Sequence, residues 1–442
     1  MLDDFILENN HERKALMIKG YAGTGKTSVV SSLVKVLKYY DYKSLLLAPT
    51  GRASKVMAQY AERKAFTIHK IIYKLKSERG SDRLVFSKSK NYYKKTIFIV
   101  DEVSMLSDRS EFGSASLLDD LISYVFESKS NKLILIGDNA QLPPVGQEDS
   151  PALQIDRLLA DYKLDIHEVE FRQVMRQQED SGILFNATNL REQIRHKTTD
   201  IKFITKGFSD IFKMTAEKME DGLRYSYDKF GIENTTIICR SNREAVQYNE
   251  YIRRSIMFYE NEIEAGDYLM VVRNNYTVLE DDSAAGFIAN GDFVEVMKIK
   301  NFEDMHGFRF ATLELRLIDY PQELPFETKV VLDTLHANTT AMTTEENKKL
   351  YDSVRLDYED IISHKDRAKA IKADEYLNAL QVKFAYALTC HKSQGGQWKS
   401  VFVSQGYLKD DMLNHEYLRW LYTALTRATD ELYLMNFDKR FF

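Results

Sequence analysis

A strand, a glycine-rich loop and a helix follow one another at residues 15–28, ALMIKGYAGTGKTS. The apolar start predicts a buried strand, and VVSSLVKVLKYY after the loop has the spacing of an amphipathic helix. Between them stands Gly20-x-x-x-x-Gly25-Lys26-Thr27, whose backbone N–H groups can wrap phosphates at a helix N-terminus. A glycine-rich turn with a solvent-exposed lysine would not need this flanking strand and helix. The pattern therefore predicts an α/β domain that binds a nucleotide.

Each kind of residue in this loop has a role in holding a nucleotide. Lys26 can reach the terminal phosphates, and the hydroxyl of Thr27 is placed to bind Mg²⁺. The glycines let the backbone approach the phosphates closely. We therefore expect ATP and Mg²⁺ as ligands, with the nucleotide bound by Gly20, Ala22, Gly23, Thr24, Gly25, Lys26, Thr27 and Ser28.

Two further apolar strands end in polar residues that suit nucleotide hydrolysis. TIFIVDEVSM delivers Asp101 and Glu102 at the carboxyl end of a strand, where α/β sheets build their sites. Asp101 is placed to hold Mg²⁺, and Glu102 to orient or deprotonate an attacking water. KLILIGDNAQLPPVG repeats the arrangement, and the amide of Gln141 can both donate and accept near a γ-phosphate. These residues favour hydrolysis of the nucleotide over its storage.

The composition is that of a globular protein with several domains. A chain of 442 residues with 44% hydrophobic residues can form roughly two to four domains. The net charge of −5 argues against a histone-like polycation but allows a local basic groove. Cys239 and Cys390 are far apart, which argues against a disulfide framework and a zinc site. The charged first residues are unlike a signal peptide and no apolar run reaches membrane-spanning length, so we expect a cytoplasmic protein without membrane contact.

One basic segment contrasts with the acidic net charge. Residues 73–95, YKLKSERGSDRLVFSKSKNYYKK, carry eight Lys or Arg and two acids, with aromatic residues interleaved. Bases stack on aromatic rings while phosphates pair with lysines, so this composition indicates a nucleic-acid surface. The charge alone is explained equally well by a solvated surface.

Two neighbouring segments support the nucleic-acid interpretation. LLLAPTGRAS places Pro49, Thr50 and Gly51 at a helix start that suits a backbone phosphate of another molecule. In FTIHK, Thr67 and His69 can act in the same way, although a lone histidine is more often structural.

A second loop of small and polar residues lies in ALTCHKSQGGQW, far downstream of the first. A short strand leads into Cys390–Gly396, which predicts a second nucleotide-side loop on a second α/β domain, with Gly395 and Gly396 as nucleotide contacts. LRWLYTALTRATDELYLM then predicts a helix and a strand that present Arg427. An arginine from a facing domain stabilises charge on a transferred phosphoryl group. Arg172 and Arg176 are upstream candidates for a similar task.

The order of these motifs resembles superfamily 1 helicases, in particular superfamily 1B with its RecD-like, Dda-like and Pif-type members. GYAGTGKT is similar to motif I, APTGRAS to Ia, TIHK to Ib, DEVSM to II and GDNAQLPPVG to III. VMRQQEDSGI resembles motif IV, ALTCHKSQGGQW motif V and YTALTRA motif VI. The resemblance frames nearly the whole chain, apart from residues 266–374, which carry no diagnostic motif.

The resemblance implies roles for individual residues. Catalysis falls to Lys26, Asp101, Glu102, Gln141, Arg176 and Arg427, with Thr27 and Asp101 as metal ligands. Single-stranded DNA would lie along Pro49, Thr50, Gly51, Thr67, His69, Thr389 and His391, with Phe86 on a pin that splits the duplex. The adenine-reading Gln that the family places ahead of motif I has no counterpart before Gly20. Base selectivity is then relaxed, or adenine is held by stacking.

The implied fold class is α/β with two RecA-like P-loop NTPase domains. Domain 1A is expected at residues 1–70 and 96–150, with a small β-hairpin insertion, 1B, at 71–95. Domain 2A is expected at 151–265 and 375–442, with an SH3-like β-barrel insertion, 2B, at 266–374. Within 2B, FIANGDFVEVMKI, FRFATLELRLI and TKVVLDTL alternate like barrel strands, and a charged helical stretch follows.

The leading hypothesis is an ATP-dependent DNA helicase that moves 5′ to 3′ on single-stranded DNA and unwinds duplex, with the polarity implied by the resemblance alone. Its partners would be single-stranded DNA and single-strand–duplex junctions, with a single-strand-binding or recombination protein as a further candidate, and we expect a monomer. Two alternatives stay open. One is a translocase on single strands, or an RNA helicase. The other is an ATP-dependent DNA-binding subunit of a recombination or repair complex that needs a partner for unwinding.

Overall fold

The computed structural model describes residues 2–7, 13–77, 84–109, 116–171, 181–279, 283, 285 and 287–442, without the side chains of residues 2, 27, 75–77 and 84–86. The chain divides into two compact units. Unit 1 consists of Met1–Lys74, Ser87–Met214 and Ser393–Phe442, and unit 2 of Leu75–Phe86 and Thr215–Lys392. Within these described ranges, no helix has both the length and the apolar character needed to cross a membrane.

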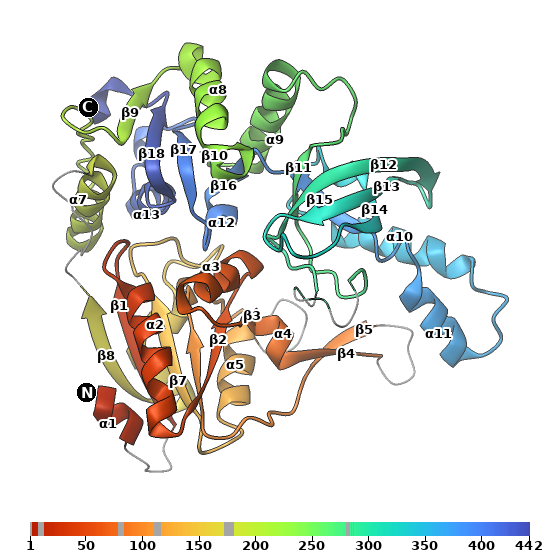
Figure 1. The fold of residues 1–442 in the computed structure, drawn as a ribbon, viewed down its shortest axis with the longest axis horizontal. Helices are drawn as coiled ribbons and strands as arrows, with labels where there is room; N and C mark the ends of the chain where they lie inside the picture. The colour runs from red at the N-terminus through yellow and green to blue at the C-terminus, as the bar shows by residue number, and fades with distance from the viewer. Residues whose placement is uncertain are drawn as a thin grey trace. The chain divides into compact units, whose positions relative to one another are not determined.

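A parallel six-stranded sheet in the order β3-β2-β6-β7-β1-β8 forms the centre of unit 1 (Figure 1). Its strands are β1 (Lys14–Gly20), β2 (Lys43–Ala48), β3 (Ala65–Thr67), β6 (Thr96–Val100), β7 (Lys132–Gly137) and β8 (Asp165–Phe171). The three central strands are in register, with Met17 beside Leu135 and Phe98 beside Leu133. Such strands are buried on both faces, which explains their continuous apolar runs.

Helices cover both faces of this sheet (Figure 1). Along β7, Leu133 and Leu135 point into one core, and Ile134 and Ile136 into the other, because successive side chains alternate between faces. The first core takes residues from α4, α5 and α6, and the second from α1, α2 and α3. The helices of unit 1 are α1 (Leu2–Leu7), α2 (Lys26–Leu37), α3 (Gly51–Ala61), α4 (Ile68–Ile72), α5 (Leu117–Val125), α6 (Ile155–Tyr162), α7 (Gly182–His196) and α13 (His415–Leu425).

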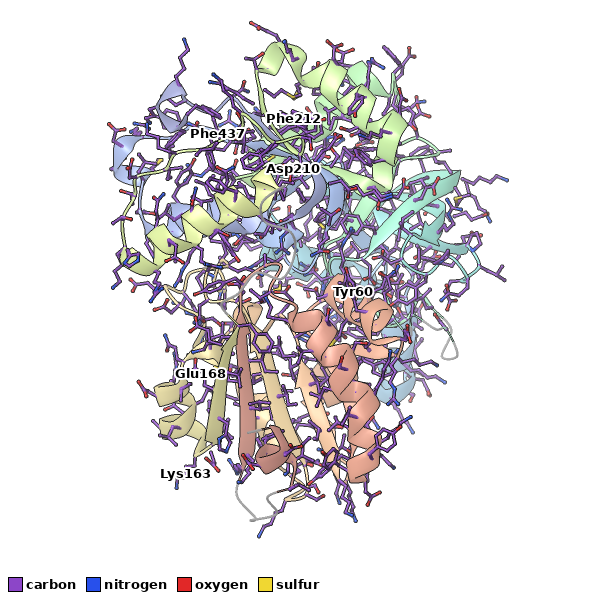
Figure 2. The ribbon with its side chains drawn as sticks, turned by 60° about the vertical axis from the view of Figure 1, so that its left-hand side comes forward. Tyr60, Lys163, Glu168, Asp210, Phe212 and Phe437 are labelled. Atoms are coloured by element: carbon purple, nitrogen blue, oxygen red, sulfur yellow. The ribbon has the colours of Figure 1, made fainter. Side chains whose placement is uncertain are left out.

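Three more parallel strands of unit 1 pair in the order β17-β18-β9: β17 (Trp398–Ser404), β18 (Ala428–Met435) and β9 (Ile211–Met214). Tyr433 on β18 stacks on Phe402, with ring centroids 4.4 Å apart, and on Phe212, at 5.1 Å. Asp210 lies just before Phe212 (Figure 2) and caps α7, because its carboxylate accepts from the backbone N–H of Gly182 at 2.8 Å. These contacts fix β9 and α7 around β18.

Unit 2 contains a closed barrel, which confirms the barrel expected from the alternating strands. It is formed by β11 (Tyr268–Val271), β12 (Phe293–Met305), β13 (Phe308–Leu317), β14 (Phe326–Val331) and β15 (Leu380–Phe384). The strands β10 (Thr235–Cys239) and β16 (Ala387–Thr389) pair in parallel. The helices are α8 (Met219–Phe230), α9 (Asn242–Tyr251), α10 (Thr344–Leu356), α11 (His364–Ala373) and α12 (Cys390–Ser393). The chain also forms a two-stranded sheet of β4 (Tyr73–Ser77) and β5 (Leu84–Lys88).

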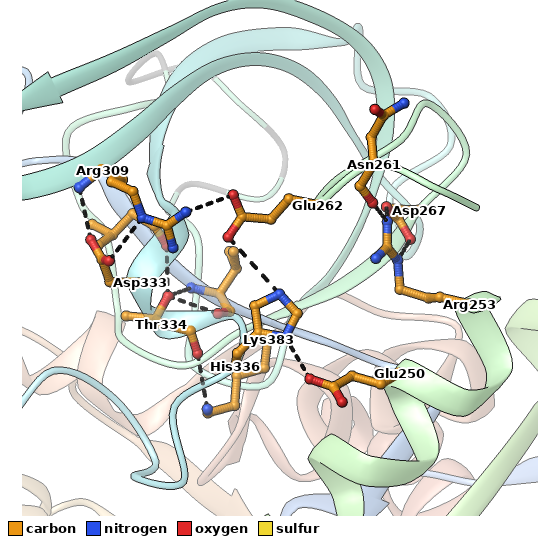
Figure 3. Close-up of polar contacts among 12 residues, drawn as sticks. Glu250, Arg253, Asn261, Glu262, Asp267, Arg309, Asp333, Thr334, His336 and Lys383 are labelled. Carbon is orange, nitrogen blue, oxygen red and sulfur yellow. Dashed lines mark hydrogen bonds and ion pairs between the residues drawn. The ribbon is translucent and has the colours of Figure 1, made fainter.

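A polar network joins α9 and the segment after it to the barrel (Figure 3). The guanidinium of Arg253 donates to both carboxylate oxygens of Asp267, from Nε at 2.7 Å and from Nη2 at 2.8 Å. Both side chains are almost fully buried, with 5% and 0% exposed. Beside them, Glu262 accepts from Arg309 at 2.9 Å. The buried pair ties the segment after α9 to the first barrel strand.

Candidate functional site

The loop between β1 and α2 has the backbone shape that its glycines predict. Gly23 and Gly25 adopt φ angles of 78° and 84°, in the left-handed region that favours glycine. Gly25 is the N-cap of α2 and makes no side-chain cap, so a ligand can take the first N–H groups of the helix. This geometry fits a phosphate group.

Polar side chains of the loop bond back to its start. The Nζ of Lys26 donates to the carbonyls of Gly20, at 2.5 Å, and Tyr21, at 3.0 Å. The hydroxyl of Thr24 donates to the carbonyl of Tyr21 at 2.8 Å. These bonds keep the lysine charge at the loop. Thr27 lies in α2, but its side chain falls outside the described structure, and Ser28 is exposed on the same helix.

The strand β6 delivers Asp101 and Glu102 directly after its last residue. The carboxylate of Asp101 accepts from the N–H of Glu102 at 2.8 Å. Burial and the negative charge of Glu102 raise the pKa of Asp101 to about 7, while the positive charge of Lys26 opposes the shift. Lys26 therefore lies close enough to Asp101 for their charges to interact, as a site for a phosphate with a metal ion requires.

The loop after β7 carries the predicted sensor. Asp138 accepts from the N–H of Ala140 at 2.9 Å, and Gln141 follows with 5% of its surface exposed. Within the described part of the chain, the amide oxygen of Gln141 is buried and has no hydrogen-bond partner. Buried polar atoms are nearly always satisfied, so this oxygen is a candidate acceptor for a bound molecule. An amide oxygen can only accept, so an attacking water, which can donate a hydrogen, is a suitable partner.

The predicted arginines fall in different parts of the chain. Arg427 is buried, and its guanidinium donates to the carbonyls of Gly396, at 3.1 Å, and Thr423, at 3.0 Å. Both acceptors are uncharged, so these bonds orient the side chain without neutralising it. Arg172 and Arg176 lie outside the described residues. Phe86 lies in β5, and its side chain is also outside what the structure describes.

The predicted DNA contacts of unit 1 stand at two helix starts. Thr50 and Thr67 are the N-caps of α3 and α4, and each hydroxyl accepts a backbone N–H at 3.2 Å. A hydroxyl that accepts can still donate its hydrogen, so each can also bond a phosphate oxygen. Pro49 precedes Thr50, and Gly51 is the first residue of α3. Burial lowers the pKa of His69 to about 4, so its imidazole is neutral at pH 7.

Gly395, in the downstream loop, packs closely against the start of α3. It has a φ angle of 73°, and a Cβ placed on it would lie 2.7 Å from the Cβ of Ala53 and 3.3 Å from the hydroxyl of Thr50. Beside it, Gly396 lies against the ring of Trp398 and the guanidinium of Arg52. These two glycines, predicted as nucleotide contacts, thus pack against the helix predicted to contact DNA.

We predict that Gly395→Ala destabilises unit 1 more than Gly207→Ala does. Gly207 also has a positive φ, of 90°, but no atom of the described residues lies within 4 Å of its added Cβ. Gly207→Ala should therefore cost about 1–2 kcal/mol of backbone strain, and Gly395→Ala about 1–3 kcal/mol more from overpacking. Urea denaturation followed by tryptophan fluorescence reports on unit 1, because both tryptophans, Trp398 and Trp420, lie there. Equal losses of stability would contradict the close contact.

The remaining predicted DNA contacts belong to unit 2. Thr389 ends β16, where it pairs with Cys239 of β10, and His391 lies in α12. The neighbouring Lys392 donates to Asn290 at 2.8 Å, and burial lowers the pKa of Lys392 to about 8.

Comparison with known proteins gives matches to both ends of the chain. Residues 4–147 match the family described as AAA domain, and residues 384–435 match the UvrD-like helicase C-terminal domain. The uncharacterized protein R530 of Acanthamoeba polyphaga mimivirus is 24% identical over 98% of this chain and 97% of its own length. The ATP-dependent DNA helicase dda of Enterobacteria phage T4 is 31% identical over 33% of this chain and 31% of its own length. These matches confirm the resemblance to superfamily 1B helicases.

A similar fold is found among solved structures. The Pif1 helicase from Bacteroides in complex with ADP-AlF3 and ssDNA has a TM-score of 0.51 at 17% sequence identity. The likeness covers 98% of this chain and 91% of that chain. It shows a shared helicase-like α/β fold, with parallel sheets that resemble two RecA-like domains.

Two residues that sequence analysis did not assign to the site form hydrogen bonds to Leu142, the neighbour of Gln141. The hydroxyl of Thr423 accepts from the N–H of Leu142 at 2.9 Å, and the amide of Gln394 donates to the carbonyl of Leu142 at 2.8 Å. Thr423 stands in YTALTRA and Gln394 in HKSQG. A signal was available for Thr423, because its neighbours Trp420, Leu421, Ala424 and Leu425 are apolar and a polar residue among them calls for a role.

Proposed function

We propose that this protein is an ATP-dependent DNA helicase that moves 5′ to 3′ on single-stranded DNA. The observation that carries the proposal is the strand order β6-β7-β1 in the first sheet. Parallel neighbours bring their carboxyl ends to one edge. That edge therefore receives Asp101 with Glu102, Gln141, and the phosphate loop, which are the parts that ATP hydrolysis needs.

The proposed catalytic residues have separate roles. Lys26 stabilises negative charge on the transferred phosphoryl group. Glu102 orients the attacking water and accepts its proton. Gln141 senses the γ-phosphate through its amide NH₂, which can donate to a phosphate oxygen. Its amide oxygen, which has no hydrogen-bond partner among the described residues, supports a contact with the attacking water. Arg176 and Arg427 supply positive charge to the same group.

The oxygen donors at this edge fit Mg²⁺, a hard cation that is bound by a few protein oxygens together with substrate phosphates. Thr27 and Asp101 would hold it. When bound, the ion neutralises charge on the β- and γ-phosphates. The raised pKa of Asp101 is compatible with this role, because a nearby cation favours the ionised carboxylate.

The DNA-binding proposal rests on groups that suit the phosphate backbone of DNA rather than its bases. The capping hydroxyls of Thr50 and Thr67 and the neutral imidazole of His69 suit phosphate contacts that do not read sequence. Pro49, Gly51, Thr389 and His391 complete the proposed contacts. The Bacteroides Pif1 helicase in its complex with ssDNA supports this substrate class.

We propose the domain division expected from the motifs. Residues 1–70 and 96–150 form domain 1A, with insertion 1B at 71–95 carrying Phe86 on the pin. Residues 151–265 and 375–442 form domain 2A. The closed barrel supports an SH3-like insertion 2B at about 266–374, although the strand that closes the barrel, β15, follows at Leu380–Phe384.

The proposal predicts that the protein opens a duplex with a 5′ single-stranded tail and leaves the same duplex with a 3′ tail intact. The measurement is strand separation with fluorescently labelled DNA, with ATP and with a non-hydrolysable analogue as the control. The analogue should give no separation, because unwinding requires hydrolysis.

Other outcomes distinguish the alternatives. Opening of the 3′-tailed duplex alone would keep the motor and overturn the polarity. If neither duplex opens while single-stranded DNA stimulates ATP hydrolysis, the protein is a translocase or a subunit that needs a partner. Stimulation by RNA but not by DNA would indicate an RNA helicase.

A further inference from the structure

The hydroxyl of Tyr422 lies between two parts of the candidate ATP site. It accepts from the backbone N–H of Ala22 in the phosphate loop at 2.9 Å. It donates to the carboxylate of Asp138 in the loop after β7 at 2.8 Å. Tyr422 is on α13 and Asp138 directly follows β7, and each has 1% of its surface exposed. One buried hydroxyl thus connects three elements of unit 1.

The direction of these bonds is fixed by chemistry. The backbone N–H of Ala22 can only donate, so a lone pair of the Tyr422 hydroxyl faces Ala22 and the hydroxyl hydrogen points to the carboxylate of Asp138. The other oxygen of Asp138 accepts from Ala140, one residue before Gln141. Burial and the negative charge of Asp138 raise the pKa of Tyr422 well above its usual range, so the phenol stays protonated. The chain of bonds therefore runs from the phosphate loop to the loop that carries the sensor.

The next residue of α13 holds the same loop on the far side of Gln141. The Thr423 hydroxyl accepts from the N–H of Leu142 at 2.9 Å. Gln141 therefore stands between two anchored points, Asp138 and Leu142, both bonded to α13. Because transition-state stabilisation depends on groups held in place before the reaction, this double attachment matters for catalysis more than for binding.

We propose that Tyr422 is a positioning residue for ATP hydrolysis, which fixes the phosphate-loop amide of Ala22 relative to Asp138 and the sensor Gln141. The inference rests on the proposed ATPase activity. Tyr422 acts through other residues, since it is assigned no contact with the reacting atoms. Its signature is a loss of kcat that is larger than any change in KM for ATP.

The experiment compares Tyr422→Phe with Tyr433→Phe. Tyr433 is a matched control on β18: it is 7% exposed, and its hydroxyl donates to the carboxylate of Glu431 at 2.6 Å. Both variants remove one buried hydroxyl that donates to a carboxylate. We expect kcat with saturating single-stranded DNA to fall about tenfold in Tyr422→Phe, with KM changed less than kcat. Tyr433→Phe should keep the wild-type kcat. The melting temperature should fall by a similar amount in the two variants.

A second pair of variants tests the adjacent anchor without changing Tyr422. Thr423→Val removes the hydroxyl but keeps the shape of the side chain, and Thr423→Ser keeps the hydroxyl. We expect a lower kcat in Thr423→Val and recovery in Thr423→Ser. This pair keeps the test usable if Tyr422→Phe fails to fold.

The outcomes separate the inference from the proposed function. A wild-type protein without ATPase activity would refute the proposed function. An active wild type with unchanged kcat in Tyr422→Phe would refute the inference alone. So would a change in KM without a change in kcat, or equal losses of kcat in Tyr422→Phe and Tyr433→Phe.

Discussion

Lys26→Ala should reduce DNA-stimulated ATP hydrolysis by at least about 10²- to 10³-fold, the usual effect of removing one group that stabilises charge in a transition state. The side chain lies at the first residue of α2, close enough to Asp101 for their charges to interact. Alanine removes the positive charge from the position where the terminal phosphates would gain negative charge. The measurement is steady-state phosphate release with saturating single-stranded DNA.

The matched control for this prediction is Lys35→Ala in the same helix. The Lys35 side chain is 59% exposed and forms an ion pair with Glu62 at 3.6 Å on the protein surface. Exposed pairs contribute little, so the rate and the melting temperature should stay close to the wild-type values. Turnover of Lys26→Ala within tenfold of that control would contradict the assignment of the phosphate loop.

Asp267→Ala should lower the free energy of unfolding by about 3–5 kcal/mol, as expected when a buried ion pair loses one partner. The carboxylate of Asp267 accepts from Nε and Nη2 of Arg253 (Figure 3). It also accepts from the N–H of Glu264 at 2.7 Å and from the hydroxyl of Tyr386 at 3.0 Å. Alanine would leave a buried guanidinium without its counter-ion. Urea denaturation followed by circular dichroism measures the loss.

Two controls sharpen the interpretation of Asp267→Ala. In the double variant Arg253→Met with Asp267→Leu, both charges are gone, and most of the stability should return because no buried charge is left unpaired. Asp41→Ala breaks an ion pair on the surface, in which the side chain of Asp41 is 87% exposed and that of Lys95 is 65% exposed. It should lower the free energy of unfolding by at most about 1 kcal/mol. If Asp267→Ala is no worse than Asp41→Ala, the buried pair does not hold the barrel to the segment after α9.

The phosphate loop and the sheet around it could be predicted from sequence because their signals are local. Left-handed φ angles at Gly23 and Gly25 favour glycine, so the positions of the glycines in the sequence predict the shape of the loop. The apolar runs of β6 and β7 likewise predict strands that are buried on both faces. The alternation of apolar and polar residues in the barrel strands is also a local signal. The closure of the barrel by Leu380–Phe384, a strand that sequence analysis joined to the following domain, depends on pairing with distant strands and is not local.

The residue types by themselves determined that this chain binds a nucleotide at a loop between a strand and a helix, and they placed acids and an amide after the neighbouring strands. The tertiary structure decided which side chains hold those groups in place. Tyr422 reaches Ala22 across 400 positions, and Thr423 reaches Leu142 across 281. Turns and strands are specified by short-range sterics and periodicity, whereas a hydrogen bond between distant residues depends on how whole elements pack. A tyrosine and a threonine in an apolar helix carry no local mark of their partners.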